Sequence, residues 1–367
     1  MPADLTPVDR LFLERACELA ARGIGSTAPN PPVGAVIVRD GRILGEGFHH
    51  KAGLAHAETN ALEAAGDVRG ATVYVSLEPC DHVGRTPACS QSLIDAGVAR
   101  VVAGALDPNP RTNGRGIARL RSAGIDAMVV DDARSLHLIE PFAYAVRHNR
   151  PYAALKMAMS LDGFITSKPG VQQWITSEDE RLYVRDLRIG YDAVMVGAGT
   201  VRVDDPQLTV RPEAHRLRPF TRVVACETDT VPASSRVFAP AEDYAKTVVL
   251  APAGARKRFG NLASVADLLF VGGPSDAHLD LSEAMRALRT HGIQSVLCEG
   301  GPTLGARLIR SGVVDRFYWA IAPVLLGNAL AVPVLSSADA TPGVRLRFER
   351  SECVGEDVVV SGRFEYV

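Results

Sequence analysis

Hydrophobic and polar positions alternate along the chain with two periods, which predict strands and helices in turn. Between residues 8 and 22 apolar side chains recur at helical spacing, and Gly23 follows as a stop signal. Two short apolar runs, 33–38 and 43–48, are separated by Asp40-Gly41, which is typical of a hairpin turn. Further helices are expected at 56–65, 89–96 and 115–123, and further strands at 72–77, 100–105 and 126–130. Strands that alternate with helices predict an α/β sheet that is covered on both faces.

The same alternation restarts in the second half of the chain. The stretch 146–151 is polar and ends in proline, so we place a domain boundary there and expect two domains, 1–147 and 148–367. A chain of 367 residues also exceeds what one hydrophobic core usually organises. The expected strands of the second domain include 152–159, 193–196, 222–225, 247–250 and 295–298, and its expected helices include 177–188 and 282–291. Both domains are therefore expected to be α/β.

Composition narrows the class of protein. Hydrophobic residues make up 47% and charged residues 22% of the chain, which is typical of a soluble globular protein. A formal charge of −2 argues against a nucleic-acid-binding protein, because such domains usually have a basic excess. No apolar run approaches the roughly 18–20 residues of a membrane helix, and the first ten residues do not have the apolar stretch of a signal peptide. The six scattered cysteines argue against a disulfide scaffold and favour a cytoplasmic protein.

One group of residues has the spacing of a metal site. His56 opens a predicted helix, Cys80 follows a predicted strand, and Cys89 opens the next helix. One imidazole and two thiolates suit zinc and leave a fourth position for water. Zinc lowers the pKa of such a water to about 7. Glu58 lies two residues from His56, need not bind the metal, and can carry protons from the water to a ring nitrogen and a departing amine.

The pattern His-x-Glu followed by Pro-Cys is the signature of zinc deaminases, although here the cysteines are spaced as Cys-x8-Cys. A His-x-Glu triplet alone is mostly chance, and two cysteines nine residues apart are mostly unrelated thiols. Their order, at the predicted ends of strands and helices, favours a site. His82 lies between the cysteines and is assigned to the loop, not to the metal.

Residues 77–89, LEPCDHVGRTPAC, closely resemble the corresponding loop of the bifunctional riboflavin-biosynthesis deaminase/reductases, and residues 29–34 (PNPPVG) and 107–110 (DPNP) match two further motifs of that family. The resemblance implies a cytidine-deaminase-like three-layer domain that deaminates a diaminopyrimidinone ribosyl phosphate. It also implies that the substrate-binding residues are Asn30, His49, Arg85, Asp107 and Asn109. Asn and Asp can read a pyrimidinone edge, whereas His and Arg can hold a phosphate.

The second half contains a weaker signal for a nucleotide. The strand 295–298 leads through Glu299 and a Gly300-Gly301 turn into a predicted helix. Glycines at such a turn let backbone amides approach a pyrophosphate, and the helix N-terminus favours its charge. Gly-Gly turns are common, however, and no G-x-G-x-x-G follows the first strand, so a Rossmann domain is not favoured.

Taken together, the segments of the second half resemble the reductase domain of the same family, which has a dihydrofolate-reductase-like fold and uses NADPH. The resemblance implies reduction of the ribosyl chain to a ribityl chain after deamination, with Lys156 beside the sugar carbonyl as a catalytic residue. The implied cofactor-binding residues are Ala158, Trp174, Thr200, Asp204, Gly300, Gly301, Pro302, Thr303 and Leu304. The implied substrate-binding residues are Gln172, Arg188, Leu208, Arg211 and Glu299, with the two arginines around the phosphate. We also expect a homo-oligomer formed through this domain, and neither a nucleic acid nor a membrane as partner.

Two positions depart from the family pattern. Gln172 stands where a small hydroxyl residue is usual, and Cys226-Glu227 stand where Asp and a small polar residue are usual. A carboxylate near the 2′-phosphate of NADPH is unfavourable, so the preference for NADPH over NADH is left open. Two other functions also remain as alternatives: a nucleoside or tRNA-base deaminase with an appended domain, and a second half that only binds phosphate or mediates dimerisation.

Overall fold

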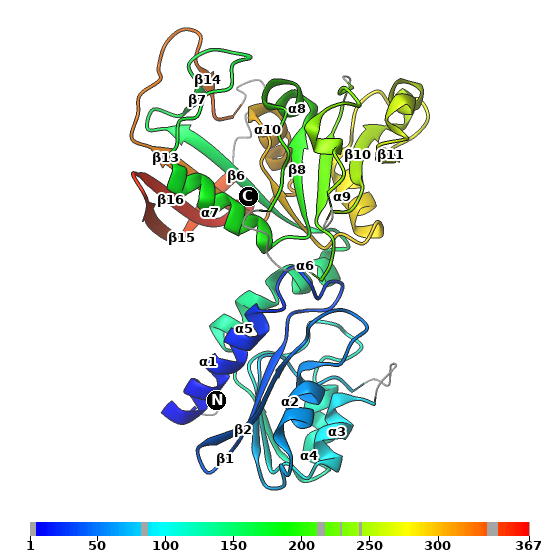
Figure 1. Ribbon diagram of the computed structural model, residues 1–367, viewed down its shortest axis with the longest axis vertical. Helices are drawn as coiled ribbons and strands as arrows, with labels where there is room; N and C mark the ends of the chain where they lie inside the picture. Colours follow the sequence, from blue (N-terminus) through cyan, green and yellow to red (C-terminus); the bar gives the residue numbers. More distant parts are fainter. Residues whose placement is uncertain are drawn as a thin grey trace. The chain divides into compact units, whose positions relative to one another are not determined.

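The computed structural model describes residues 5–81, 87–210, 217–227, 230–241, 244–335 and 344–366. The chain divides into two compact units, Met1–Asn149 and Arg150–Val367, each built on one main β-sheet (Figure 1). No helix in the described ranges is both long enough and apolar enough to cross a membrane.

The sheet of the N-terminal unit has five strands in the order β2-β1-β3-β4-β5. These are β1 (Gly34–Arg39), β2 (Arg42–Phe48), β3 (Thr72–Val75), β4 (Arg100–Ala103) and β5 (Asp126–Val129). β1 pairs antiparallel with β2 and β3, whereas β3, β4 and β5 run parallel. The predicted hairpin turn between β1 and β2 is confirmed: Asp40 and Gly41 both have positive φ, 52° and 73°, as a tight two-residue turn requires.

Helices cover both faces of this sheet, as predicted. On one face α1 (Pro7–Ala21) packs Phe12 and Leu13 against Val36 and Tyr74. The opposite face, which includes Ile37, is covered by α2 (Ala57–Ala65), α3 (Cys89–Asp95) and α4 (Arg115–Ser122). Neighbouring residues of a strand point to opposite faces, so one apolar strand supplies both cores. The unit ends with α5 (Ala133–Leu138) and α6 (Glu140–His148).

The C-terminal unit has a nine-stranded sheet in the order β11-β10-β9-β8-β12-β6-β13-β16-β15. Its strands are β6 (Tyr152–Ser160), β8 (Ala193–Gly197), β9 (Thr221–Ala225), β10 (Thr247–Pro252), β11 (Ala266–Val271), β12 (Ser295–Cys298), β13 (Arg316–Ala322), β15 (Val344–Val354) and β16 (Asp357–Tyr366). The strands from β11 to β13 pair in parallel, and β16 and β15 add an antiparallel hairpin at one edge. A separate short pair joins β7 (Phe164–Thr166) to β14 (Val332–Pro333).

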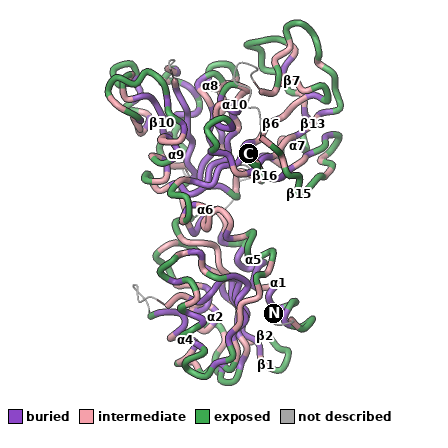
Figure 2. Tube along the Cα trace, turned by 180° about the vertical axis from the view of Figure 1, so that it is seen from behind, coloured by how far each residue is buried: buried purple, intermediate pink, exposed green. Residues whose placement is uncertain are grey.

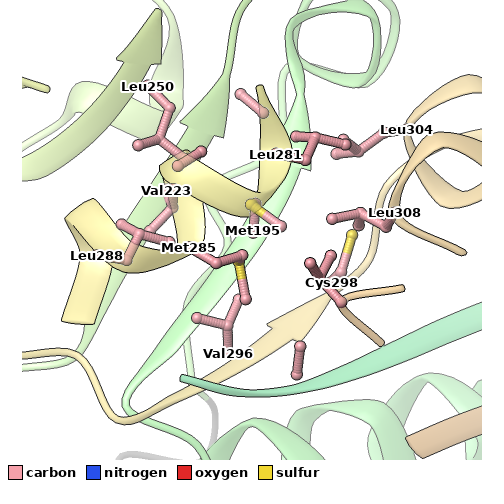
Figure 3. Packing of buried hydrophobic residues seen from close by; sticks show 14 of the residues in the cluster. Met195, Val223, Leu250, Leu281, Met285, Leu288, Val296, Cys298, Leu304 and Leu308 are labelled. Atoms are coloured by element: carbon pink, nitrogen blue, oxygen red, sulfur yellow. The ribbon is translucent and has the colours of Figure 1, made fainter. Parts of the chain in front are cut away.

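The larger core of this unit lies between the sheet and two helices, α9 (Leu281–Thr290) and α10 (Pro302–Arg310). Figure 3 shows Met285 and Leu288 of α9 close to Val223 and Met195 of the sheet. The opposite face carries a second core around Phe220. It includes residues of α8 (Ala198–Asp204) and of the 3-10 helix Ala253–Leu262. Inner strands such as β1, β8 and β10 are buried along almost their whole length (Figure 2), and the α/β class predicted for both halves is confirmed.

Candidate active sites

The three side chains predicted as metal ligands converge beside the starts of α2 and α3. His56 Nδ1 lies 3.6 Å from Cys80 Sγ and 3.3 Å from Cys89 Sγ. The candidate ligand atoms of the three residues all lie within 4.8 Å of one another. Tetrahedral zinc, with Zn–S of about 2.3 Å and Zn–N of about 2.0–2.1 Å, separates a nitrogen and a sulfur ligand by roughly 3.5 Å. The donor set and its spacing therefore fit a zinc ion.

Local backbone structure explains why these side chains meet. His56 lies one residue before α2, at the N-cap position, with extended backbone angles (φ −76°, ψ 168°), and its ring makes no capping hydrogen bond. The N–H of Cys89, the first residue of α3, donates to Cys80 Sγ over 3.4 Å. Hydrogen bonds from Cys89 and His56 lower the pKa of Cys80 to about 4, although burial opposes this shift. A sulfur with a lowered pKa is already prepared to bind metal as the thiolate.

Glu58 lies on the first turn of α2, next to this cluster, and is only 3% exposed. Burial, together with the nearby Cys80 sulfur, raises the pKa of Glu58 to about 7. A cation bound by the three ligands would lower this pKa again, because an opposite charge favours the carboxylate. Glu58 is therefore placed beside the metal cluster, where its carboxylate can accept a proton from a metal-bound water.

Asn30 and His49 form a hydrogen-bonded pair beside the metal cluster. Asn30 Nδ2 donates to His49 Nε2 over 3.1 Å, and His49 Nδ1 donates to the Ala55 carbonyl over 3.0 Å. Burial lowers the pKa of His49, whose ring lies edge-on to that of His56 with 5.3 Å between centroids. The imidazole thus orients Asn30.

Asp107 and Asn109 lie in the loop between β4 and α4. The N–H of Asn109 donates to Asp107 Oδ1 over 2.9 Å, so the loop is closed by its own side chain. Glu78, which is not among the residues predicted from the sequence, holds this loop in place. Its buried carboxylate accepts N–H groups from Asp107 at 3.2 Å, Gly114 at 2.9 Å, Gly116 at 3.0 Å and Ile117 at 3.3 Å.

A glycine-rich start of α4 explains why Glu78 is needed. Gly114, the N-cap residue, has a φ of 75° and no side chain with which to cap the helix. A Cβ at Gly116 would lie 1.8 Å from the carbonyl oxygen of Pro79, so the helix start and the segment before Cys80 are in direct contact. The first N–H groups of a helix need an acceptor, and Glu78 supplies it. The sequence signal that could have identified Glu78 is its position directly before Pro79-Cys80. The predicted Arg85 lies outside the described residues.

Two adjoining pockets lie in the C-terminal unit, near the carboxyl ends of β8 and β12. We name them after one lining residue each: the Lys156 pocket, of about 470 Å³, and the Arg307 pocket, of about 660 Å³. Both volumes are in the range of small-molecule sites. The pockets share a wall made of Ile165, Gln172, Gln173, Trp174, Thr200, Asp204 and Gly301.

The Lys156 pocket gathers the predicted catalytic residue Lys156 and the described residues predicted to bind the substrate of the reductase: Gln172, Arg188, Leu208 and Glu299. Lys156 Nζ lies 2.8 Å from Glu180 Oε1, and Thr176 Oγ1 donates to Oε2 of Glu180 over 2.9 Å. Glu180 and Thr176 are not among the residues predicted from the sequence. Glu180 lies in the first turn of the predicted helix 177–188, where acidic residues are common, so the sequence does not indicate that it pairs with Lys156.

Arg188 lines this pocket and is held by acceptors of the protein. Its Nε and Nη2 donate to the carboxylate of Glu299 over 2.6 and 2.7 Å, and its Nη1 donates to the Thr209 carbonyl over 2.7 Å. The guanidinium is thus engaged by the protein itself, and the predicted Arg211 lies outside the described residues. Arg185, on α7 (Glu178–Ile189), lines the same pocket, and its side chain makes no hydrogen bond or ion pair with the residues that the structure describes.

The Arg307 pocket gathers the remaining residues predicted to bind the cofactor. Pro302, Thr303 and Leu304 line it together with Trp174, Thr200, Asp204 and Gly301, whereas Ala158 and Gly300 line the Lys156 pocket. Gly301 is the N-cap of α10 and makes no side-chain cap, so the first N–H groups of this helix are open to a pyrophosphate. A Cβ at Gly301 would meet only Thr200 Oγ1, at 3.7 Å. The space and the donors therefore fit a dinucleotide.

Two family models match the chain, one for each unit. Residues 151–360 match the RibD C-terminal domain, and residues 7–105 match the cytidine and deoxycytidylate deaminase zinc-binding region. The chain is also 37% identical over 355 residues to the riboflavin biosynthesis protein RibD of Aquifex aeolicus, a match that covers 96% of this chain and 98% of that protein. The chain belongs to the RibD family.

Other RibD proteins give the same picture. The RibD of Escherichia coli is 38% identical over 371 residues, with 95% of this chain and 98% of that protein covered. Among solved structures, Acinetobacter baumannii RibD superimposes with a TM-score of 0.84 at 34% identity, covering 98% of this chain and 99% of that chain. A diaminohydroxyphosphoribosylaminopyrimidine deaminase/5-amino-6-(5-phosphoribosylamino)uracil reductase from Thermotoga maritima gives 0.82 at 35% identity, covering 97% and 98%.

Membership of the RibD family assigns the activity. The chain is a bifunctional enzyme of riboflavin biosynthesis, with a zinc-dependent, cytidine-deaminase-like domain followed by an NADPH-dependent reductase domain. The expected family, cofactors and pair of activities are confirmed. The alternative of a nucleoside or tRNA-base deaminase with a non-catalytic second domain is not favoured, because RibD proteins match over both units.

Proposed function

We propose that the N-terminal unit deaminates 2,5-diamino-6-ribosylamino-4(3H)-pyrimidinone 5′-phosphate and that the C-terminal unit reduces the ribosyl chain of the product to a ribityl chain. The name of the similar Thermotoga maritima enzyme supports this pair of substrates. The observation that carries the deaminase half is the convergence of His56 Nδ1 on two sulfurs, at 3.3 and 3.6 Å, beside the buried Glu58.

In the deaminase site, His56, Cys80 and Cys89 would hold the zinc ion. Zinc, when bound there, lowers the pKa of a water to about 7 and so makes a nucleophile available at neutral pH. Glu58 takes up one proton of the attacking water and delivers it to the ring nitrogen, and it then carries the second proton of the same oxygen to the amino group, which leaves as ammonia. The burial of Glu58 keeps both protons between its carboxylate and the substrate.

Substrate recognition in this site falls to side chains whose orientation is fixed by the protein. Asn30, held by His49, and the loop residues Asp107 and Asn109, held by Glu78, present amide and carboxylate groups to the edge of the pyrimidinone. The phosphate is assigned to His49 and Arg85, the two side chains of this set that can hold it.

In the reductase site, the sugar binds in the Lys156 pocket and the cofactor in the Arg307 pocket. NADPH supplies the hydride. Lys156 donates a hydrogen bond from Nζ to the carbonyl oxygen of the opened ribosyl chain, where negative charge develops as hydride arrives. Arg185 and Arg211 bind the phosphate, and Arg188 fixes Glu299 so that its carboxylate accepts from sugar hydroxyls. The shared wall around Trp174 and Thr200 brings the nicotinamide to the sugar.

We also propose that the protein forms a homo-oligomer through the reductase unit. We further propose that it works in the cytoplasm. Large apolar side chains exposed on that unit, such as Leu325 at 74% and Phe348 at 62%, support an interface there. Six free cysteines support a reducing compartment. Light scattering of the purified enzyme tests the oligomer, and a monomer across the working concentration range would contradict it.

The proposed function is tested by supplying the diaminopyrimidinone phosphate with and without NADPH and identifying the products by mass spectrometry. Without NADPH we expect the product in which oxygen replaces one ring amino group, and with NADPH the ribityl product. Glu58→Gln is expected to lower deamination by about 10²–10⁴-fold while zinc content and reduction of the deaminated compound persist. Glu63→Gln, an exposed site on the same helix, is the matched control. Deamination at full rate by Glu58→Gln would remove Glu58 from its role.

A further inference from the structure

The Arg307 pocket has a nicotinamide end and an adenosine end. Hydride transfer requires the nicotinamide to lie against the sugar, so this ring must occupy the wall that both pockets share, around Trp174, Thr200 and Gly301. The strands follow one another across the sheet in the order β6, β12, β8, β9. The lining residues at the carboxyl end of β9, Ala225 and Glu227, belong only to the Arg307 pocket. The adenosine therefore lies at the β9 end.

Three charged or titratable side chains meet at that end. Arg307 of α10 forms an ion pair with the carboxylate of Glu227, and His278 Nδ1 lies 2.8 Å from Glu227 Oε1. A second donor of the arginine, Nη2, binds the carbonyl of Leu279 over 2.8 Å, which keeps the guanidinium in the pocket wall. The side chains of Glu227 and Arg307 are 30% and 23% exposed, so both are accessible to a ligand in the pocket.

The two dinucleotides place opposite demands on this ion pair. NADPH carries a 2′-phosphate on the adenosine ribose, which an arginine binds and a carboxylate repels. NADH carries a free 2′-hydroxyl instead, from which a carboxylate accepts a hydrogen bond. Since Glu227 occupies the guanidinium of Arg307, a 2′-phosphate must displace a carboxylate in order to bind, whereas a 2′-hydroxyl can use that carboxylate directly.

We propose that Glu227, through its ion pair with Arg307, is a specificity-determining residue that narrows the preference of the reductase for NADPH over NADH. The proposal goes beyond NADPH-dependent reduction and rests on the cofactor position proposed above. It predicts that the enzyme uses both dinucleotides and that the charge at position 227 sets their ratio.

Binding titrations of the full-length enzyme test this directly, with NADPH and NADH as probes and the fluorescence of the reduced nicotinamide as the signal. Glu227→Gln is expected to raise the affinity for NADPH by about tenfold, because it removes the charge that competes with the 2′-phosphate. It is expected to lower the affinity for NADH, because it removes the strong acceptor of the 2′-hydroxyl. Arg307→Gln is expected to lower the affinity for NADPH about tenfold or more, while the affinity for NADH changes little. The ratio of kcat/KM for the two dinucleotides should move in the same directions.

Two further variants make the outcome decisive. Glu356→Gln removes the same charge from an exposed turn of the same unit, and its affinity ratio should equal that of the unaltered enzyme. Gly301→Ala, which the free protein accommodates, should weaken both dinucleotides alike. If Glu227→Gln leaves the ratio of NADPH to NADH affinity unchanged while Gly301→Ala weakens the binding of both dinucleotides, the role of Glu227 is overturned and the proposed cofactor position stands. If Gly301→Ala also leaves both affinities unchanged, the cofactor position proposed above fails, and the inference fails with it.

Discussion

Lys156 on β6 and Glu180 on α7 form an ion pair in the wall of the Lys156 pocket, with 2.8 Å between Nζ and Oε1. The side chain of Glu180 is 1% exposed, and that of Lys156 is 13% exposed. Because Thr176 holds the second carboxylate oxygen, the glutamate has little freedom to move. The ammonium group is therefore fixed at one point of the pocket before any substrate arrives.

Replacing Lys156 with Met is expected to lower the rate of reduction by about 100-fold, since one donor to the developing oxyanion is lost. Deamination should be unaffected. NADPH oxidation with the deaminated compound and ammonia release with the first substrate measure the two activities separately.

The same replacement leaves Glu180 as an unpaired buried charge, at a cost of about 3–5 kcal/mol. The double variant Lys156→Met, Glu180→Gln is the control, because it removes both charges. It should recover thermal stability but not reduction. Recovery of the rate as well would reduce Lys156 to a structural role.

Replacing Cys89 with Ser should strip the enzyme of zinc, because a hydroxyl oxygen is a much poorer ligand than the thiolate. Metal analysis after desalting is expected to fall from one zinc per chain to a small fraction, with loss of deamination. Cys17→Ser is the matched control, since Cys17 is also buried but contacts Ser135, away from the cluster. Equal zinc content in both variants would show that the ligand assignment is wrong.

Replacing Glu78 with Gln should damage deamination without touching the metal ligands. The amide NH₂ cannot accept, so two of the four N–H groups that Glu78 receives lose their partner. We expect a loss of about 2–3 kcal/mol in the free energy of unfolding and a several-fold rise in the KM for the pyrimidine, with reduction unchanged. Urea titration and steady-state kinetics check both, with Glu63→Gln alongside. An unaltered KM would mean that the 107–113 loop does not depend on this carboxylate.

Asp9 predicts how the N-terminal unit responds to acid. Its buried carboxylate accepts from Arg100 at 2.6 Å and from Tyr74 at 2.8 Å. Burial by itself would raise the pKa of Asp9, but the hydrogen bonds from Arg100, Thr6 and Tyr74 outweigh it and hold that pKa well below the usual 3.8. Such a group contributes stability that is present above the unfolded-state pKa and is lost as the pH falls through the folded-state value.

The free energy of unfolding of this unit should therefore decline as the pH is lowered below about 4. Asp9→Asn should be less stable at pH 7 but should show a shallower decline in acid. Urea unfolding at several pH values, followed by circular dichroism, gives both slopes. Parallel slopes for the two proteins would count against Asp9 as a source of the acid sensitivity.

The metal cluster could be predicted from the sequence because His56 and Cys89 stand at the starts of helices and Cys80 follows a strand. The strand predicted at 72–77 is shorter in the structure, where β3 ends at Val75. The helix predicted from residue 56 differs only in that His56 lies just before it, at the N-cap. The Arg188–Glu299 pair could not be predicted, since 111 residues separate the two and nothing local indicates that they meet. The resemblance to the family places both residues at the substrate, but it does not indicate that they bind each other.

The hairpin formed by β15 and β16 was also not predicted. β15 is exposed along most of its length, but Val344, Leu346 and Phe348 alternate with Arg345, Arg347 and Glu349, so the period of a strand is present in this part of the sequence. Its position at the sheet edge depends on pairing with β16, which is a tertiary property. Local patterns therefore indicate the strand itself, but they do not indicate its partner or its place at the sheet edge.

The wall shared by the Lys156 and Arg307 pockets has a consequence for kinetics and for inhibitor design. Both reactants must be seated together before hydride can pass, so initial-rate plots should intersect instead of running parallel. A single elongated molecule that joins a ribityl phosphate mimic to a nicotinamide mimic would fill both hollows at once, and it would gain the affinity that tethering provides.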